Sequence, residues 1–296
     1  MKPQTIPAGE QVLADVPLLS WQTGIAPDLV LRWNAMPARP AALDIVLHLH
    51  GYATEGGNMN LAAVKLPISG LDFGDPDKPP GESAARSRPT LAILPRGRFF
   101  GGKSGFGYDF PVLIAKPGAQ RLLRLARDLF RDATGLVRAG EGRRVLTAHS
   151  GGGIAVMPVA EQIDPHEIHV FDGLYAEAPL LAQWAEHAIA RDAAALRASP
   201  LMGVGAYMER WGRALRVLYI PGTGTEPASQ TLAEAVDRAL AKAGPAGSKL
   251  APWYRVEAVT VEHLRMPRLF GWKLLADAGA GIVEAQREAE AGSPSR

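Results

Sequence analysis

Residues 143–156, which read RRVLTAHSGGGIAV, carry the strongest indication of the fold in this sequence. Its first half is apolar and short, as in a buried strand, and its second half has the composition of a tight turn that leads into a helix. A strand that reverses into a helix within a few residues strains the backbone at its apex, so the neighbouring residues must be small. Because Ala148, Gly151 and Gly152 are small, the pattern predicts a strand, a turn with Ser150 at its apex, and a helix.

Ser150 is a candidate nucleophile in such a turn. The turn holds the hydroxyl clear of its own backbone, and the amide of Gly151 at the helix N-terminus can face developing negative charge. The stretch resembles the nucleophile elbow of the α/β-hydrolase family, G-x-S-x-G, with Ala148 in place of the first glycine. Taken alone, it also fits a glycine-rich turn in another α/β protein, including one that cradles a phosphate.

Composition favours one large folded domain and excludes several classes of function. The chain has 296 residues, of which 47% are hydrophobic, and this is enough for a full core with or without a small cap. The net charge is only +2 and the basic residues are dispersed, so we expect no nucleic-acid partner. The absence of cysteine excludes disulfides, thiolate metal sites and cysteine nucleophiles. No cluster of His and carboxylate residues has metal-ligand spacing, so we expect neither a metal nor another cofactor.

The sequence shows no targeting or membrane-spanning segment. The first 19 residues lack a basic start followed by an apolar run, so we expect no signal peptide. No stretch approaches the ~18 apolar residues of a spanning helix. A cytoplasmic location follows as the default expectation, although a signal peptide removed beforehand would leave the same appearance. The sequence does not determine the oligomeric state.

Apolar and alternating segments predict a mostly parallel sheet with helices on both faces. Strands are expected over 11–21 and 29–36, which start the sheet as an antiparallel pair, and then over 43–50, 91–95, 144–149, 166–172, 216–220 and 254–261. Helices are expected over 119–133, 179–195, 198–211, 229–243 and 270–278. The resemblance thus implies an edge segment (1–28), an α/β-hydrolase domain (29–278) with lid or rim segments at 54–89 and about 176–212, and a flexible tail (279–296).

A serine nucleophile needs a general base, and the base needs an acid to orient it. In the family that the chain resembles, these residues follow in the order Ser, acid, His. His263 comes directly after the last expected strand and is the base that the resemblance implies. Asp172 ends one strand and Glu226 follows the next, and both are candidate acids. We favour Asp172, because a short side chain at a strand end is held more firmly than Glu226 beyond a Gly-Thr-Gly-Thr turn.

Two further groups of residues are candidates for substrate contacts. The resemblance implies an oxyanion hole formed by the amides of Gly151 and Tyr52, since His50-Gly51 ends the third expected strand. The glycine-rich loop at 98–110 offers aromatic side chains that either line a substrate pocket or anchor the loop to the core: Phe99, Phe100, Phe106 and Tyr108. The segment 97–104 also matches the phosphate-loop spelling G-x-x-x-x-G-K-S, but its two phenylalanines and the lack of a following helix argue against that function. We expect His48 and His149 to serve packing.

The sequence therefore predicts a metal-free serine hydrolase that acts on a small or polymeric carboxylic ester. An amidase or peptidase would use the same residues. A binding protein that kept the fold without catalysis is the alternative outside the enzymes. The sequence does not predict the acyl chain or the leaving group of the substrate.

Overall fold

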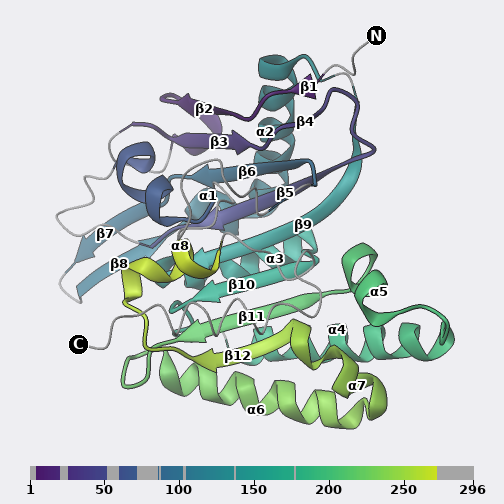
Figure 1. The fold of residues 1–296 in the computed structure, drawn as a ribbon. Helices are drawn as coiled ribbons and strands as arrows, with labels where there is room; N and C mark the ends of the chain where they lie inside the picture. Colours follow the sequence, from purple (N-terminus) through teal and green to yellow (C-terminus); the bar gives the residue numbers. More distant parts are fainter. Residues whose placement is uncertain are drawn as a thin grey trace.

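The computed structural model of the protein describes residues 5–20, 26–51, 60–71, 86, 88–102, 105–136, 138–176 and 178–271, with backbone alone at 99–102 and 105–108. Its centre is an eight-stranded sheet in the order β12-β11-β10-β9-β5-β6-β3-β2 (Figure 1). These strands are β2 (Gly9–Leu13), β3 (Leu29–Trp33), β5 (Ala42–Leu49), β6 (Thr90–Pro95), β9 (Gly140–His149), β10 (Glu167–Phe171), β11 (Ala214–Tyr219) and β12 (Tyr254–Ala258).

The sheet is mostly parallel, as predicted. β3 runs antiparallel to both of its neighbours, β2 and β6, and every other pair of neighbouring strands is parallel. Successive residues of a strand face opposite sides of the sheet. On β5, Ile45 and Leu47 join the larger apolar cluster on one face, and Val46 joins a smaller cluster on the other.

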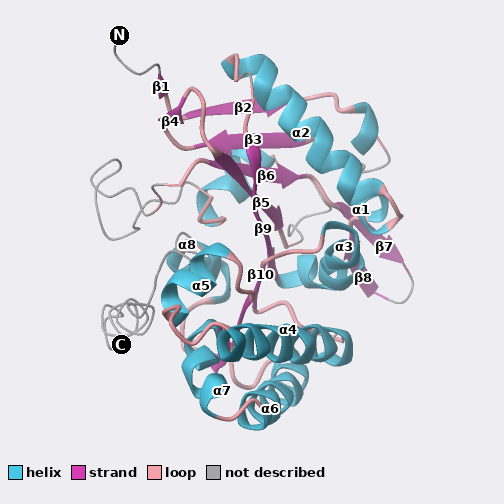
Figure 2. Ribbon diagram, turned by 90° about the vertical axis from the view of Figure 1, so that its right-hand side faces the viewer, coloured by secondary structure: helices cyan, strands magenta, loops and turns pink. Residues whose placement is uncertain are grey.

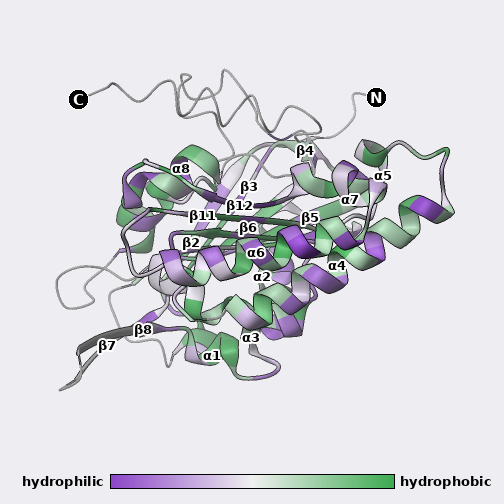
Figure 3. Cartoon of the chain, turned by 90° about the horizontal axis from the view of Figure 1, so that it is seen from below, coloured by the Kyte–Doolittle hydropathy of each residue, from purple (hydrophilic) through white to green (hydrophobic). Residues whose placement is uncertain are grey.

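Helices cover both faces of this sheet, which confirms the second part of the prediction (Figure 2). The larger cluster lies under α2 (Gly118–Thr134), α3 (Val156–Ile163), α4 (Ala178–Ala198) and α6 (Glu226–Lys242). The opposite face is covered by the short turns η2 (Leu61–Lys65) and η3 (Leu66–Ile68) and by α8 (Met266–Phe270). The long helices α4 and α6 carry hydrophobic and hydrophilic residues along their length, as expected for helices with one buried side (Figure 3).

Smaller elements complete the described chain. They are β1 (Thr5–Ile6), η1 (Pro17–Leu19), β4 (Met36–Pro37), β7 (Arg98–Gly102), β8 (Gly105–Asp109), α1 (Pro111–Ile114), η4 (Ser150–Ala155), α5 (Val204–Arg210), α7 (Pro245–Leu250), η5 (Ala251–Trp253) and η6 (His263–Arg265). No described helix combines the length and the apolar character needed to cross a membrane.

The structure corrects three local predictions. The strand expected over 11–21 ends at Leu13, and a turn begins at Pro17, which has no amide hydrogen for a sheet. The expected loop at 98–110 is instead a hairpin of β7 and β8. The last strand stops at Ala258, short of the predicted end. α8 covers Met266–Phe270, with Pro267 accommodated in its first turn, and so lies just before the helix expected over 270–278. Residues 272–278 of that expected helix, like most of 54–89 and the tail, lie outside the described ranges.

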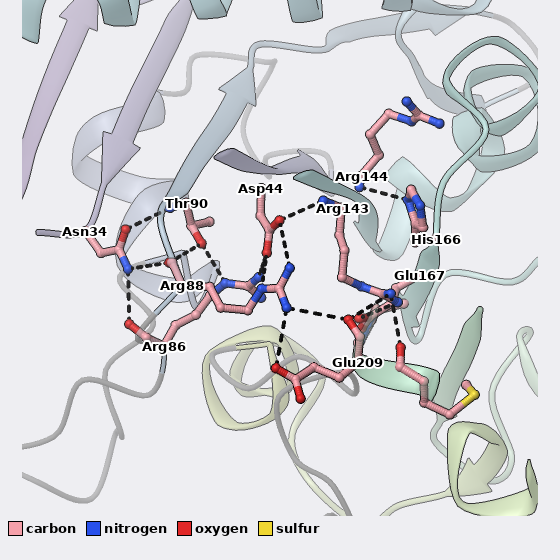
Figure 4. Close-up of polar contacts among 12 residues, drawn as sticks. Asn34, Asp44, Arg86, Arg88, Thr90, Arg143, Arg144, His166, Glu167 and Glu209 are labelled. Carbon is pink, nitrogen blue, oxygen red and sulfur yellow. Dashed lines mark hydrogen bonds and ion pairs between the residues drawn. The ribbon is translucent and has the colours of Figure 1, made fainter. Parts of the chain in front are cut away.

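Buried ion pairs tie the strands together at their amino ends (Figure 4). Asp44 of β5 bonds the guanidinium groups of Arg86 and Arg88, and its Oδ1 accepts the backbone amide of Arg143 at 2.7 Å. The guanidinium of Arg143 donates to Glu167 Oε1 of β10 at 3.3 Å. Charged side chains therefore link β5, β9 and β10 at this end of the sheet.

Candidate active site

The candidate site lies at the carboxyl edge of the parallel strands. The register pairs Ala148 of β9 with Leu49 of β5, and His149 of β9 with Phe171 of β10. Parallel strands in this register end side by side, so Ser150 and Asp172, which directly follow β9 and β10, emerge at the same edge.

Ser150 sits at a strained turn, as the small residues around it predict. Its φ is +51°, in the left-handed region that residues other than glycine seldom adopt. The chain passes from β9 directly into the 3-10 turn η4 and then into α3, so the reversal is tighter than the α-helical start expected from sequence. Ser150 is only 8% exposed in the described structure.

Two glycines, which follow the neighbouring strands β5 and β10, lie in close contact with Ser150. A Cβ added at Gly51, which follows β5, would lie 2.7 Å from Ser150 Cβ, and one added at Gly173, which follows Asp172, would lie 2.6 Å from the Ser150 carbonyl oxygen. Both distances are too short for real carbon and oxygen contacts. The backbones on both sides of the elbow can therefore approach it only because these two residues lack side chains.

Asp172 and His263 are joined by a short hydrogen bond. The distance from His263 Nδ1 to Asp172 Oδ2 is 2.6 Å, although 91 residues separate them in the chain. The other carboxylate oxygen accepts the hydroxyl of Thr225 and, at 3.4 Å, the amide of Ile220. Asp172 itself has a φ of +44°, and its amide donates to the carbonyl of Leu218 at 2.7 Å.

The hydrogen bonds to Asp172 determine its charge state. Burial by itself raises the pKa of this carboxyl, but the bonds from His263, Thr225 and the Ile220 amide outweigh burial and lower the pKa below its usual value. Asp172 is therefore an anion at neutral pH. An anion at His263 Nδ1 keeps the proton on that nitrogen and leaves Nε2 as the basic nitrogen of the ring.

His263 also lies beside the strand that leads to Ser150. Its ring packs against the ring of His149 with centroids 4.5 Å apart, and its carbonyl accepts a hydrogen bond from His149 Nε2 at 3.0 Å. The side chain of His263 is 34% exposed, so it is open to solvent on one side.

The second candidate acid, Glu226, is bonded within its own segment of the chain and not to His263. Glu226 is the first residue of α6, and its Oε2 accepts the amide of Gly222 at 2.9 Å while Oε1 accepts Gln230 Nε2 at 3.1 Å. Both oxygens are therefore engaged at the start of this helix. The structure brings Asp172, and not Glu226, to His263.

The expected oxyanion and aromatic residues are described only in part. Gly51 packs beside Ser150, but Tyr52 lies outside the described residues. Phe99, Phe100, Phe106 and Tyr108 have their backbones in the β7–β8 hairpin, and their side chains lie outside the described part. β8 of this hairpin packs against η4, directly after Ser150.

Sequence reasoning missed two residues that shape the site. Thr225 bonds Asp172 from the Gly-Thr-Gly-Thr turn that precedes Glu226, and nothing in the local sequence indicates this contact. The His50-Gly51 pair predicts no role for the His50 side chain, yet its Nδ1 donates to the Gly51 carbonyl at 2.7 Å and its Nε2 accepts the Gly97 amide at 3.0 Å. His50 thus ties the turn at Gly51 to the loop before β7. Across the described residues, no three His, Asp or Glu side chains are grouped as a metal site requires.

Comparisons with known proteins found likeness in structure alone. No family model matches the sequence, and no curated protein matches it. Among solved structures, a lidless α/β serine hydrolase from Xanthomonas campestris is 14% identical, with 97% of each chain covered and a TM-score of 0.39. The bacterial brefeldin A esterase is 12% identical over 97% of this chain and 77% of its own, with a TM-score of 0.37. A Pyrococcus furiosus esterase is 11% identical over 96% of this chain and 92% of its own, with a TM-score of 0.37.

The topology of the chain itself identifies its fold. When the eight strands of the sheet are counted in chain order, His50-Gly51 follows the third, the Ser150 turn follows the fifth, Asp172 follows the sixth and His263 follows the eighth. The strained serine stands between a strand and a helix at the carboxyl edge of the sheet. This chain has the α/β-hydrolase fold.

Proposed function

We propose that the protein is a serine hydrolase that cleaves carboxylic esters through an acyl-enzyme intermediate. The observation that carries this proposal is the 2.6 Å bond between Asp172 and His263, formed next to the strained turn of Ser150. A buried carboxylate that bonds one imidazole nitrogen makes the other nitrogen a general base. The hydroxyl of Ser150, whose backbone has a φ of +51° on a strand-to-helix turn, is the group that such a base would activate.

In the proposed reaction, Ser150 Oγ attacks the acyl carbon while His263 Nε2 takes the hydroxyl proton. The carbonyl electrons move onto oxygen, and the amides of Gly151 and Tyr52 stabilise that negative charge. When the carbonyl re-forms, the bond to the leaving alcohol breaks and His263 returns the proton to the alcohol. Water then attacks the acyl-enzyme with His263 again as the base, which releases the acid and restores Ser150. Asp172 orients the ring of His263 and stabilises its protonated form.

The leaving group separates the preferred activity from its closest alternative. An amine is a poorer leaving group than an alcohol, so amide cleavage depends more strongly on binding and on proton donation by His263. Turnover of p-nitrophenyl esters compared with the matching p-nitroanilides would decide between esterase and amidase. The aromatic residues of the β7–β8 hairpin are the proposed wall of the acyl or leaving-group pocket.

The decisive experiment replaces the nucleophile. We expect Ser150→Ala to reduce p-nitrophenyl ester hydrolysis by about four orders of magnitude or more while the protein stays folded by circular dichroism. Ser150→Ala combined with His263→Ala should be little worse than Ser150→Ala alone, because the residues act as one unit. A fluorophosphonate should label the wild type and not the variant. If Ser150→Ala keeps near-normal turnover, the proposed mechanism is wrong.

A further inference from the structure

The histidine that precedes the nucleophile contacts the candidate base directly. His149 is the last residue of β9, and its backbone is extended. Residues 145, 147 and 149 alternate with Leu146 and Ala148 along this strand, and the latter two belong to the larger apolar cluster. The His149 side chain therefore lies on the other face, where His263 meets it.

The contact combines a directional bond with ring packing. His149 Nε2 lies 3.0 Å from the backbone carbonyl of His263, so Nε2 must carry the hydrogen. The two rings are 4.5 Å apart between centroids and inclined by 39°. A bond to the backbone fixes the position of the His263 peptide, and the ring contact limits the rotation of its imidazole.

The surroundings of His149 keep its ring neutral. It is 2% exposed, and burial, together with electrostatic repulsion from His263, lowers the pKa of His149 to about 3. A neutral ring does not repel His263 when that residue becomes protonated during catalysis.

We propose that His149 is a positioning residue, which holds His263 in line with Ser150 through the bond to its carbonyl and the packing of its ring. His263 is then held at two points: Asp172 fixes its Nδ1 and His149 fixes its backbone. Because His149 and Ser150 are adjacent in the chain, the same strand end sets the position of the nucleophile and of its base. This inference rests on the proposed serine-hydrolase function.

Two substitutions at His149 separate the bond from the packing. His149→Phe keeps an aromatic ring but removes the donor, and we expect it to lower kcat by about 10- to 100-fold with KM changed by less than about threefold. The amide nitrogen of Gln reaches about as far as imidazole Nε2, so His149→Gln should recover kcat to within about fivefold of the wild type. Equal losses in both variants, or a loss in KM alone, would overturn the proposal.

A matched variant controls for the loss of a buried histidine. His48 of β5 is also buried and neutral, but its Nδ1 bonds Thr147 Oγ1 at 2.7 Å and not His263. His48→Phe should lower the thermal midpoint about as much as His149→Phe, because each leaves one polar group without its partner. Its kcat should stay within about threefold of the wild type. A drop in kcat equal to that of His149→Phe would assign both effects to stability and refute a positioning role.

One measurement is independent of turnover. The proton between His263 Nδ1 and Asp172 should give a far-downfield NMR signal, protected from water in the wild type and in His149→Gln. In His149→Phe the signal should broaden through exchange with water. If the signal in His149→Phe is the same as in the wild type, the positioning role of His149 is refuted, whether or not the protein hydrolyses esters. If the wild type shows no Ser150-dependent ester turnover, only the proposed serine-hydrolase function is refuted.

Discussion

At the scale of single residues, Asp172 unites three features of the site. Its backbone adopts a left-handed φ, its carboxylate accepts bonds from His263, Thr225 and the Ile220 amide, and its pKa is lowered by them. The next residue, Gly173, lies against the Ser150 carbonyl. A single strand end thus places the carboxylate for His263 and supports the elbow.

Replacing Asp172 by Asn should cut kcat by about three to four orders of magnitude. The neutral amide can donate to Nδ1, which favours the tautomer with the proton on Nε2, and that nitrogen then cannot act as a base. Steady-state ester kinetics would measure the loss. Glu226→Gln is the matched control, because Glu226 bonds Gly222 and Gln230 and should change kcat by less than about tenfold. A crippled Glu226→Gln with an active Asp172→Asn would reverse the proposed assignment of the acid.

At the scale of elements, the elbow depends on how closely three strand ends approach one another. β5, β9 and β10 are neighbours in the sheet, and the segments that follow them, at Gly51, Ser150 and Gly173, are in contact. The parallel register determines this proximity, because it makes the strands end at the same level.

Gly51→Ala should impair catalysis more than stability. The added methyl group would lie 2.7 Å from Ser150 Cβ and 3.2 Å from its Oγ, so the Ser150 side chain must shift. We expect kcat to fall by about 10- to 100-fold, measured on a p-nitrophenyl ester, with a free energy of unfolding reduced by about 1–3 kcal/mol.

Gly205→Ala provides the control for the same chemical change. Nothing lies within 4 Å of a Cβ added at Gly205 in α5, so this variant should keep kcat and gain up to about 1 kcal/mol in stability. If Gly51→Ala and Gly205→Ala have the same kcat, the close approach at Ser150 has no catalytic role.

At the scale of the whole molecule, the two ends of the sheet are specialised. The amino ends carry the buried ion pairs of Asp44, Arg143 and Glu167, and the carboxyl ends carry Ser150, Asp172 and His263. Glu167 is fully buried and bonds His169 Nε2 at 2.9 Å in addition to Arg143. Burial alone would raise the pKa of Glu167, but the bond from His169 and the charge of Arg143 lower it far below its usual value.

Glu167→Gln should destabilise the protein at neutral pH by about 3–5 kcal/mol, because it leaves the buried Arg143 without its charged partner. A lowered pKa in the folded state means that the stabilisation is present above the unfolded pKa of about 4.3 and is lost as the pH falls below it. The difference between wild type and variant should therefore shrink below pH ~4. Urea unfolding followed by circular dichroism across this range would measure it.

Glu234→Gln is the control for the removal of one glutamate charge. Glu234 forms an exposed pair with Arg238 on α6, at 3.6 Å, and its loss should change stability by less than about 1 kcal/mol at any of these pH values. A difference between wild type and Glu167→Gln that is small, or that grows on acidification, would contradict the role given to Glu167.

Features that depend on neighbours in the chain can be predicted from the amino-acid sequence. Apolar runs such as Leu91–Pro95 specify buried strands, and the small residues around Ser150 specify the tight turn at the elbow. The parallel character of the sheet followed from the alternation of strands and helices. These signals are local, because backbone conformation and side-chain periodicity act over a few residues.

Contacts between side chains that are far apart in the chain become visible in the folded protein alone. The choice between Asp172 and Glu226 as the partner of His263, the bond from Thr225, and the contact between His149 and His263 join residues 53 to 114 positions apart. The segment that forms β7 and β8 is rich in glycine, and this composition predicts a loop. The hairpin is stabilised by hydrogen bonds between the paired strands, which local composition does not indicate. These pairings depend on the register of the strands, which cannot be predicted from local sequence preferences.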